Sequence, residues 1–221
     1  MLNTIPFPTC LFDKYRNEQG NAVCVIKKDG TILSVKEING LTFSFESGDN
    51  TIILYEGDGF HFTNCAIGLK KNDLCVIRET KYAIRSLKIS SLRDSGTIYV
   101  GSNFSSSAVH LNVKEKKQIF IGDNCMFSNG INVLTSDMHA ILDESGKCIN
   151  HGKDILIGNN VWIGQNATIL KGSVIPDGSV VGACSVVTKA FTEKGSIIVG
   201  NPARVIRTGI TWDRRSPELW P

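Results

Sequence analysis

Apolar residues recur at every sixth position along the second half of the chain. From Ile157 the sequence divides into units that read IGNNVW, IGQNAT, ILKGSV, IPDGSV, VGACSV and VTKAF, and each begins with Ile or Val. With 42% of all residues hydrophobic, six apolar first positions in a row have odds of about one in 180 by chance. The fifth positions are small: Val161, Ala167, Ser173, Ser179 and Ser185. The frame is lost at Glu193 and returns at Val199 and Val205.

A period of six fits neither an α-helix nor an alternating strand. It predicts a parallel β-helix, in which three short faces make one coil of about 18 residues. The first residue of each unit then points inward and stacks on the residue about 18 positions later, so we expect Ile157 under Ile175. Ile163 is likewise expected under Val181. Buried strands of an ordinary sheet are the alternative, but they do not require a fixed period.

The same frame appears earlier in the chain and is interrupted by a polar segment. It includes Ile121, Phe127 and Val133. The next position in the frame is His139, where burial of a bare imidazole would be costly. We therefore predict that the chain leaves the coil near Asp137, forms a loop over residues 139–153 and rejoins the coil near Lys153. A polar loop on a rigid scaffold is a common place for function.

The first hundred residues carry no fixed period. Short apolar runs such as AVCVI, TIILY and DLCVI alternate with turn-forming KDG, SGDN and EGDG, and no segment has the length and pattern of an amphipathic helix. We expect an all-β protein with three parts. Residues 1–100 form irregular coils at the start of the β-helix, residues 101–207 form the regular coils with loop 139–153, and residues 208–221 form a tail that packs on a neighbour or is loose.

Composition narrows the possible functions. A net charge of +3 over 221 residues is too small to indicate nucleic-acid binding. No apolar run approaches the roughly 20 residues that span a bilayer, so we expect no membrane insertion. The first residues lack the basic and apolar regions of a secretory signal. Seven cysteines without a CxxC pair predict free thiols in a reducing cytosol, and hence a cytoplasmic protein.

Several motifs resemble those of the hexapeptide-repeat acyltransferases. The resemblance covers residues 100–207 and depends on TSDMHAI, VWIG, SVVTKAF and GNPARVIR in this order. The sequence looks most similar to the O-acetyltransferases of bacterial capsular polysaccharide, in particular the polysialic acid type. The resemblance implies a left-handed parallel β-helix, a homotrimer, and transfer of acetyl from acetyl-CoA to a sugar hydroxyl without a metal.

The resemblance also assigns catalytic roles. His139 matches the catalytic histidine position of the family, and a sugar hydroxyl needs such a base as it attacks. Attack is expected to be direct, without an acetyl-enzyme. Asp137 either orients the imidazole or turns the chain. Trp162 is expected on the surface beside the active site, where its indole donates to the acetyl oxygen or packs on the pantetheine arm. A subunit contact is the alternative role for Trp162.

Other positions match the CoA-binding residues of the family. Gly164, Gly182 and Ala183 would let the CoA arm approach the coil edge. Lys189 and Arg204 would bind the adenosine phosphates, with Lys171 and Arg207 as looser candidates. Among the remaining histidines, His110 is a residue of the active cleft or a surface histidine, and His151 is expected to anchor the returning loop.

Three other functions share this fold or chemistry. A γ-type carbonic anhydrase would bind zinc through histidines such as His110, His139 and His151, but the expected HxxxxH pair is absent from the sequence. A silent scaffold that binds a sugar polymer would not need the DMH motif. An N-acetyltransferase of an amino-sugar uses the same chemistry on another nucleophile. The sequence does not identify the acceptor sugar.

Overall fold

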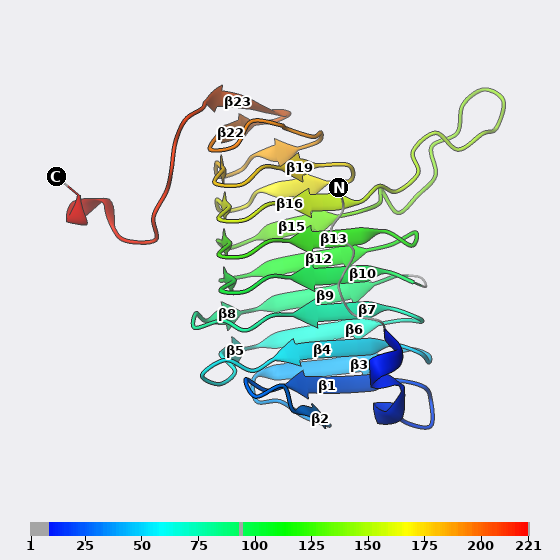
Figure 1. Cartoon of the computed structure of the whole chain (residues 1–221). Helices are drawn as coiled ribbons and strands as arrows, with labels where there is room; N and C mark the ends of the chain where they lie inside the picture. The colour runs from blue at the N-terminus through cyan, green and yellow to red at the C-terminus, as the bar shows by residue number, and fades with distance from the viewer. Residues whose placement is uncertain (1–8, 93–94, 221) are drawn as a thin grey trace.

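The computed structural model describes residues 9–92 and 95–220 and shows a parallel β-helix with three flat faces (Figure 1). Two predictions fall partly outside the described residues. Residues 1–8 belong to the segment in which the sequence shows no secretory signal, and Pro221 belongs to the predicted tail. Neighbouring strands on each face are parallel except at the two ends, where β1 pairs with β2 and β22 with β23 in antiparallel fashion. This is the predicted all-β, left-handed parallel β-helix.

Each face is a sheet of seven or eight strands. Face A contains, in spatial order, β2 (Ile32–Ser34), β1 (Ala22–Ile26), β4 (Thr51–Tyr55), β7 (Leu74–Ile77), β10 (Thr97–Val100), β13 (Gln118–Ile121), β16 (Ile155–Ile157) and β19 (Val174–Ile175). Face B contains β3 (Leu41–Phe45), β6 (Cys65–Leu69), β9 (Leu87–Ser91), β12 (Val109–Val113), β15 (Ile131–Leu134), β18 (Thr168–Leu170) and β21 (Val186–Val187). Face C contains β5 (Phe62–Thr63), β8 (Ile84–Arg85), β11 (Ser105–Ser106), β14 (Met126–Phe127), β17 (Trp162–Ile163), β20 (Val180–Val181), β22 (Ile197–Gly200) and β23 (Ala203–Arg207).

The predicted aliphatic ladder forms the core. Ile157 pairs with Ile175, and Ile163 pairs with Val181. The first position of every six-residue unit is at most 1% exposed, and the small fifth positions are equally buried. Because each coil buries its inward residues against the coils above and below, no single coil could form this core alone.

The frame after Glu193 was wrongly predicted. Ile198, not Val199, faces the core, and it pairs with Val181 at a distance of 17 positions in the sequence. The turn before β22 is one residue shorter than a regular coil allows, which shifts the inward position. β23 then folds back antiparallel on β22 and ends the β-helix.

The irregular N-terminal half continues the same β-helix with longer coils. Val109 pairs with Leu87 and with Ile131, each 22 positions away, and Leu41 pairs with Cys65, 24 positions away. The additional residues lie in the turns, which is why no period of six is visible in the sequence. Since β10 pairs with both β7 and β13, the sheets run without a break across residue 100.

Two short 3₁₀ helices complete the described chain, η1 (Thr9–Tyr15) and η2 (Pro217–Leu219). η1 lies on the outer side of face A, where Phe12 is buried against Cys24, Ile53 and Val76. Neither these nor any other helix in the described ranges is long and apolar enough to cross a bilayer. The seven cysteines are free, as predicted.

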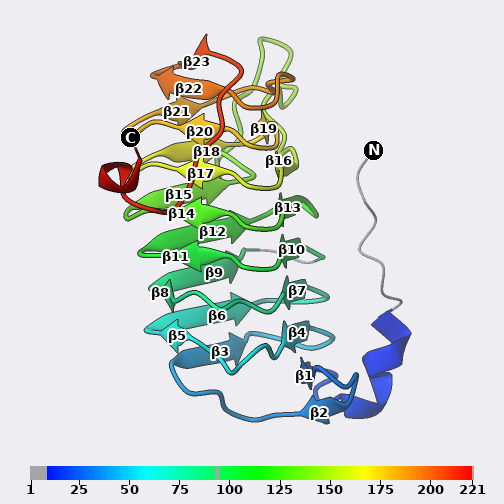
Figure 2. The same cartoon turned by 60° about the vertical axis from the view of Figure 1, so that its left-hand side comes forward.

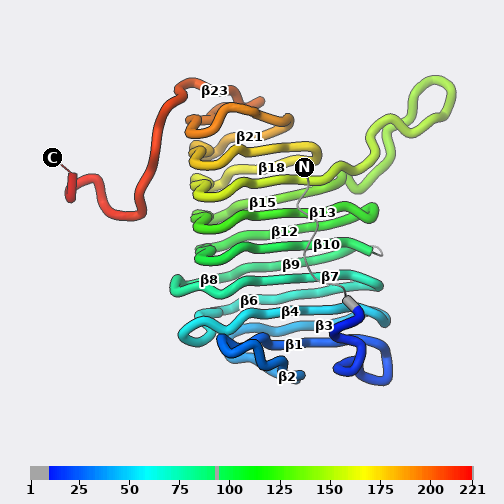
Figure 3. The backbone as a smooth tube through the Cα atoms, viewed as in Figure 1, coloured from blue at the N-terminus to red at the C-terminus, as the bar shows by residue number. Residues whose placement is uncertain are grey.

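Two segments depart from the regular coils. The segment between β15 and β16 projects from the corner where face B meets face A, and both Figure 1 and the tube in Figure 3 show it far from the stacked coils. The tail after β23 turns back along face C, which is clear in Figure 2. The tail packs on its own chain: Trp212 Nε1 donates to the carbonyl of Asn160 at 2.6 Å, and Arg214 donates to Ser105 Oγ at 2.6 Å.

Candidate functional site

His139 lies where the extruded loop leaves the β-helix. β15 ends at Leu134, and the N–H of Lys153 donates to the carbonyl of Thr135 at 3.0 Å, which closes the base of the loop as predicted. The imidazole of His139 is exposed and makes no hydrogen bond to any other described residue. It lines a hollow of about 290 Å³ together with Met138, Cys148, Asn150 and His151. The ring is therefore free to meet a ligand.

The carboxylate of Asp137 forms hydrogen bonds at the base of the loop and none with the ring of His139. It accepts them from Lys171 Nζ and from Asn150 Nδ2, the latter at 2.8 Å. The bond from Lys171 lowers the pKa of Asp137 below its usual value. The carboxylate is thus ionised throughout the neutral range, and the contacts favour the second of its two predicted roles, which is to shape the chain.

Glu115, in the turn after β12, holds the loop from the coil below. Its carboxylate accepts hydrogen bonds from Ser136 Oγ, where the chain leaves the coil, and from the N–H of Gly152, where it returns, the latter at 2.7 Å. The bond from Ser136 lowers the pKa of Glu115. His151 was predicted to anchor the return, but its exposed ring lies 4.0 Å from Glu115. A pair of that kind contributes little, so Gly152 is the stronger anchor.

Trp162 lies on face C, away from His139. Its side chain points outward, as predicted, and is 38% exposed. The indole lies 6.0 Å from the ring of Trp212 and lines a hollow of about 460 Å³ with Tyr82, Ser105 and Arg214. This hollow shares no residue with the hollow of His139. Within one chain the structure does not bring the two predicted catalytic residues together.

The small residues predicted to bind CoA lie directly after β17, which contains Trp162, and its neighbour β20. Gly164 follows β17, and Gly182 and Ala183 follow β20, which pairs with β17. A Cβ at Gly164 would lie 2.7 Å from the backbone N of Ala183, and one at Gly182 would lie 2.6 Å from Cγ1 of Val199. Contacts this short are not tolerated, so the stacking of coils already requires both glycines.

The predicted phosphate-binding cations lie on different faces. Lys189 follows β21 on face B, with Nζ 5.5 Å from the ring centroid of Phe191, whereas Arg204 lies exposed on β23 of face C. Neither is paired with a carboxylate of the described residues. Arg207 lies exposed at the end of β23. Lys171 is engaged with Asp137 in the loop, so it is not available for a phosphate.

His110 lies on the outer side of face B, on β12. Its Nε2 is 2.8 Å from Ser90 Oγ, and burial lowers its pKa. It does not line the hollow that contains His139. In the part of the chain that the structure describes, no three His, Cys, Asp or Glu side chains gather closely enough to hold a metal ion.

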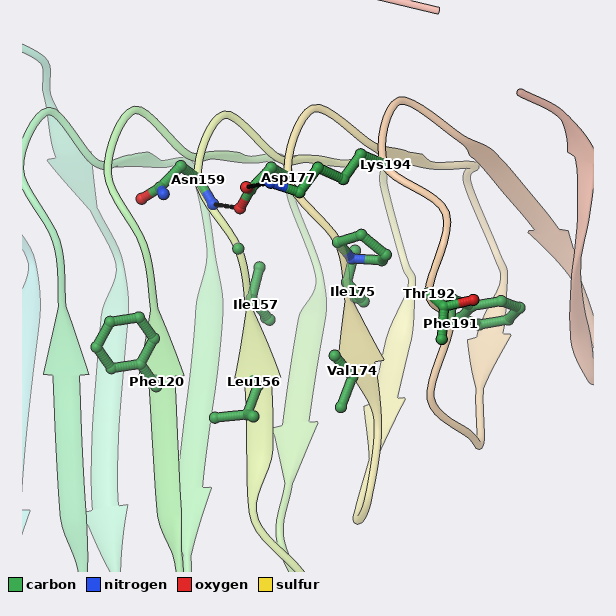
Figure 4. A pocket seen from close by; sticks show the side chains of 12 residues that line it. Phe120, Leu156, Ile157, Asn159, Val174, Ile175, Asp177, Phe191, Thr192 and Lys194 are labelled. Atoms are coloured by element: carbon green, nitrogen blue, oxygen red, sulfur yellow. Dashed lines mark hydrogen bonds and ion pairs between the residues drawn. The ribbon is translucent and has the colours of Figure 1, made fainter. Parts of the chain in front are cut away.

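An apolar groove of about 520 Å³ runs along the outer side of face A. Phe120, Leu156 and Val174 line it from consecutive coils, and Figure 4 shows the ion pair between Asp177 and Lys194 at its rim. It is lined by no residue that the sequence predicted to be catalytic or to bind the cofactor. Sequence reasoning also missed Glu115, Asn150, Trp212 and Arg214, because their roles depend on contacts between separate coils.

Comparison with known proteins identifies the repeat. Residues 154–189 match the family described as bacterial transferase hexapeptide (six repeats). The coils of residues 154–189 are hexapeptide-repeat coils. The chain is also similar to a polysialic acid O-acetyltransferase of Neisseria meningitidis, with 35% identity over 109 residues, 49% of this chain and 50% of that protein. The matched region therefore spans about half the length of this curated relative.

Solved structures extend the similarity beyond residues 154–189. The crystal structure of the polysialic acid O-acetyltransferase OatWY has a TM-score of 0.59 and 26% identity, covering 89% of each chain. The polySia-specific acetyltransferase NeuO has a TM-score of 0.54 and 23% identity, covering 90% of this chain and 92% of that one, and supports the fold alone. These matches confirm the resemblance to the hexapeptide-repeat acyltransferases.

Proposed function

We propose that the protein is an acetyl-CoA-dependent O-acetyltransferase that acts on a sugar hydroxyl of a bacterial surface polysaccharide in the cytoplasm. The observation that carries the proposal is His139: an exposed imidazole without a hydrogen-bond partner among the described residues, on a loop whose base is fixed from two sides. The similarity of the surrounding coils to polysialic acid O-acetyltransferases supports the reaction class.

The chemistry follows from what a hydroxyl needs to attack a thioester. The imidazole of His139 accepts the proton of the sugar hydroxyl as its oxygen forms a bond to the acetyl carbon. The bond from that carbon to sulfur then breaks, and the imidazolium returns the proton to the CoA thiolate. His139 carries only the proton and no side chain carries the acetyl group, so transfer is direct.

A homotrimer would complete the site. His139 and Trp162 line hollows on different sides of one chain, and the loop that carries His139 projects well beyond its own coils (Figure 1). In a trimer with parallel axes, the loop of one subunit would reach face C of the next. Trp162 Nε1 makes no hydrogen bond among the described residues, and we propose that it donates to the acetyl oxygen there.

We propose that the cofactor lies along the same edge. CoA would extend from Trp162 past Gly164, Gly182 and Ala183 towards Arg204 of face C, and Lys189, which lies on face B, would reach its phosphates from the neighbouring subunit of the proposed trimer. This order would place the thioester beside the indole and the adenosine end near the last coil. Lys189 and Arg204 suit a phosphate because neither has a carboxylate partner in the described chain.

A CoA-release assay tests the reaction. The purified protein is incubated with acetyl-CoA and a panel of capsular polysaccharides and their monomers, and the product is identified by NMR. An O-acetyl sugar is the expected product, in the presence or absence of a chelator. An N-acetyl product would instead support the amino-sugar reaction, and no release with any acceptor would overturn the proposal. Light scattering should give a particle of three chains at micromolar concentration, and a 24.1 kDa particle would exclude the trimer.

A further inference from the structure

We propose that Lys171 and Asn150 are positioning residues, which hold the backbone on both sides of His139 so that its imidazole is fixed for proton transfer. The proposal rests on the function proposed above, because positioning matters only if His139 is the base. Neither residue would touch the substrate. Both act through the peptide groups that carry His139.

Lys171, in the coil above, forms hydrogen bonds with both segments at the base of the loop. It directly follows β18, and its Nζ donates to the carboxylate of Asp137 and, at 2.6 Å, to the carbonyl of Asn150. One ammonium therefore links Asp137, in the segment that leaves the coil, to Asn150, in the segment that returns. The side chain of Lys171 is 18% exposed and that of Asp137 is 38% exposed, so the ammonium is shielded from water while the carboxylate is partly solvated.

The side chain of Asn150 reaches the backbone around His139. Its Nδ2 donates to the carbonyl of His139 at 2.9 Å and to Asp137 Oδ2 at 2.8 Å, while its Oδ1 accepts from the N–H of Ile141 at 2.7 Å. Because these bonds fix the peptide group after His139 and the N–H two residues on, they set the direction in which the imidazole leaves the chain.

The residues just before His139 are held from the coil below. Lys114 Nζ donates to the carbonyl of Met138 at 2.9 Å. Ser136 Oγ donates to the carboxylate of Glu115 and accepts the N–H of Met138 at 3.2 Å. The base of the loop is thus held by the ammonium of Lys171 from the coil above and by the carboxylate of Glu115 from the coil below. At the tip of the loop, the side chain of Asp143 accepts hydrogen bonds only from Ser145 and Lys147 among the described residues.

The ion pair between Asp177 and Lys194 provides a comparison, because it links two coils without contacting the loop. Asp177 and Lys194 lie 2.8 Å apart in the following coils, and Lys194 is 75% exposed. Asp177 accepts the N–H of Asn159, and neither residue touches the loop. Lys194→Met therefore removes an ion pair of the same chemistry without loosening His139, which makes it the matched control.

The test compares Lys171→Met and Asn150→Ala with Lys194→Met in the full chain. Misplacement of a reacting group by about 1 Å can cost about 100-fold in rate, so we expect the two loop variants to lose about 10- to 100-fold in kcat. Their Kd for acetyl-CoA should stay within about twofold, because the proposed cofactor edge is on face C. Lys171→Arg, which keeps the charge, should recover part of the loss. Lys194→Met should retain wild-type kcat.

A double-mutant cycle tests whether Lys171 acts through Asp137. In an Asp137→Asn background, Lys171→Met should cost much less than it does alone, since residues of one network are not additive. Additive losses would overturn the proposed coupling. Equal kcat values for Lys171→Met and Lys194→Met would overturn the proposal as a whole.

Hydrogen exchange separates this proposal from the proposed function. The amides of residues 138–141 should exchange faster in Lys171→Met and in Asn150→Ala than in the wild type, without any substrate present. If one variant fails to fold, the other makes the same comparison. A wild type that acetylates no acceptor would refute the acetyltransferase, whereas unchanged exchange in an active enzyme would refute the positioning role alone.

Discussion

His139 and Trp162 lie on different sides of the β-helix, in two hollows that share no residue. His139 is carried by the loop between faces B and A, and Trp162 belongs to β17 of face C. If both residues serve one reaction, they must come from two copies of the chain. The two side chains therefore make the oligomer a requirement of the proposed mechanism.

Mixed trimers test this requirement. His139→Ala and Trp162→Ala should each be nearly inactive alone. When the two variants are co-expressed in equal amounts, random mixing should leave about a quarter of the sites with both intact residues, one from each subunit. Recovery of activity is measured on the co-purified mixture. A mixture as inactive as its parents would mean that both residues act within one subunit.

The role of His139 predicts a specific kinetic signature. Because the base acts only as the hydroxyl attacks, His139→Ala should depress kcat and leave CoA affinity nearly unchanged. General-base catalysis is worth about 10²- to 10⁴-fold, and the loss should fall in or above that range. Steady-state rates with calorimetric CoA binding provide the measurement, and His151→Ala, whose ring lies 4.0 Å from Glu115, is the control that should lose far less. Retention of a tenth of the wild-type rate in His139→Ala would point to another base, with His110 tested first.

The two unpaired cations predict a preference for the phosphates of CoA. Lys189→Ala and Arg204→Ala should weaken acetyl-CoA much more than dephospho-CoA if these side chains meet the 3′-phosphate. A charge-assisted contact contributes about 1.5–3 kcal/mol, or about 10- to 150-fold in affinity. Calorimetry with both cofactors gives the comparison, and equal losses would show that the adenosine end lies elsewhere.

The regular coils could be predicted from the sequence because every inward position needs a buried aliphatic side chain. Ile157, Ile163 and Ile169 each fill the same kind of site, and the period follows from the geometry of a coil. The N-terminal coils have the same inward positions, but their turns vary in length, with spacings of 22 and 24 positions. A variable turn removes the fixed period without changing the fold.

The arrangement of the site was only partly predictable. The interruption at His139 was visible because an imidazole cannot replace an aliphatic residue in the core. Lys171, by contrast, meets Asp137 across 34 positions, and Arg214 meets Ser105 across 109. Both contacts exist only after the coils have stacked and the tail has turned back. The sequence therefore offers Lys171 as a candidate phosphate ligand, whereas its contacts are with the loop.

Gly164 distinguishes a residue needed for packing from one needed for CoA. A Cβ at this position would lie 2.7 Å from the backbone N of Ala183 and 2.8 Å from the carbonyl of Val181, so neighbouring coils would have to separate. Gly164→Ala should therefore lower the free energy of unfolding by about 1–3 kcal/mol, the usual cost of overpacking. Gly68→Ala is the control, since a Cβ there would meet only Ser44 Oγ at 3.6 Å. Denaturant titration compares the two variants, and calorimetry on the folded fraction measures CoA affinity. If Gly164→Ala kept wild-type stability but lost CoA binding, the glycine would serve the cofactor and not the stacking of the coils.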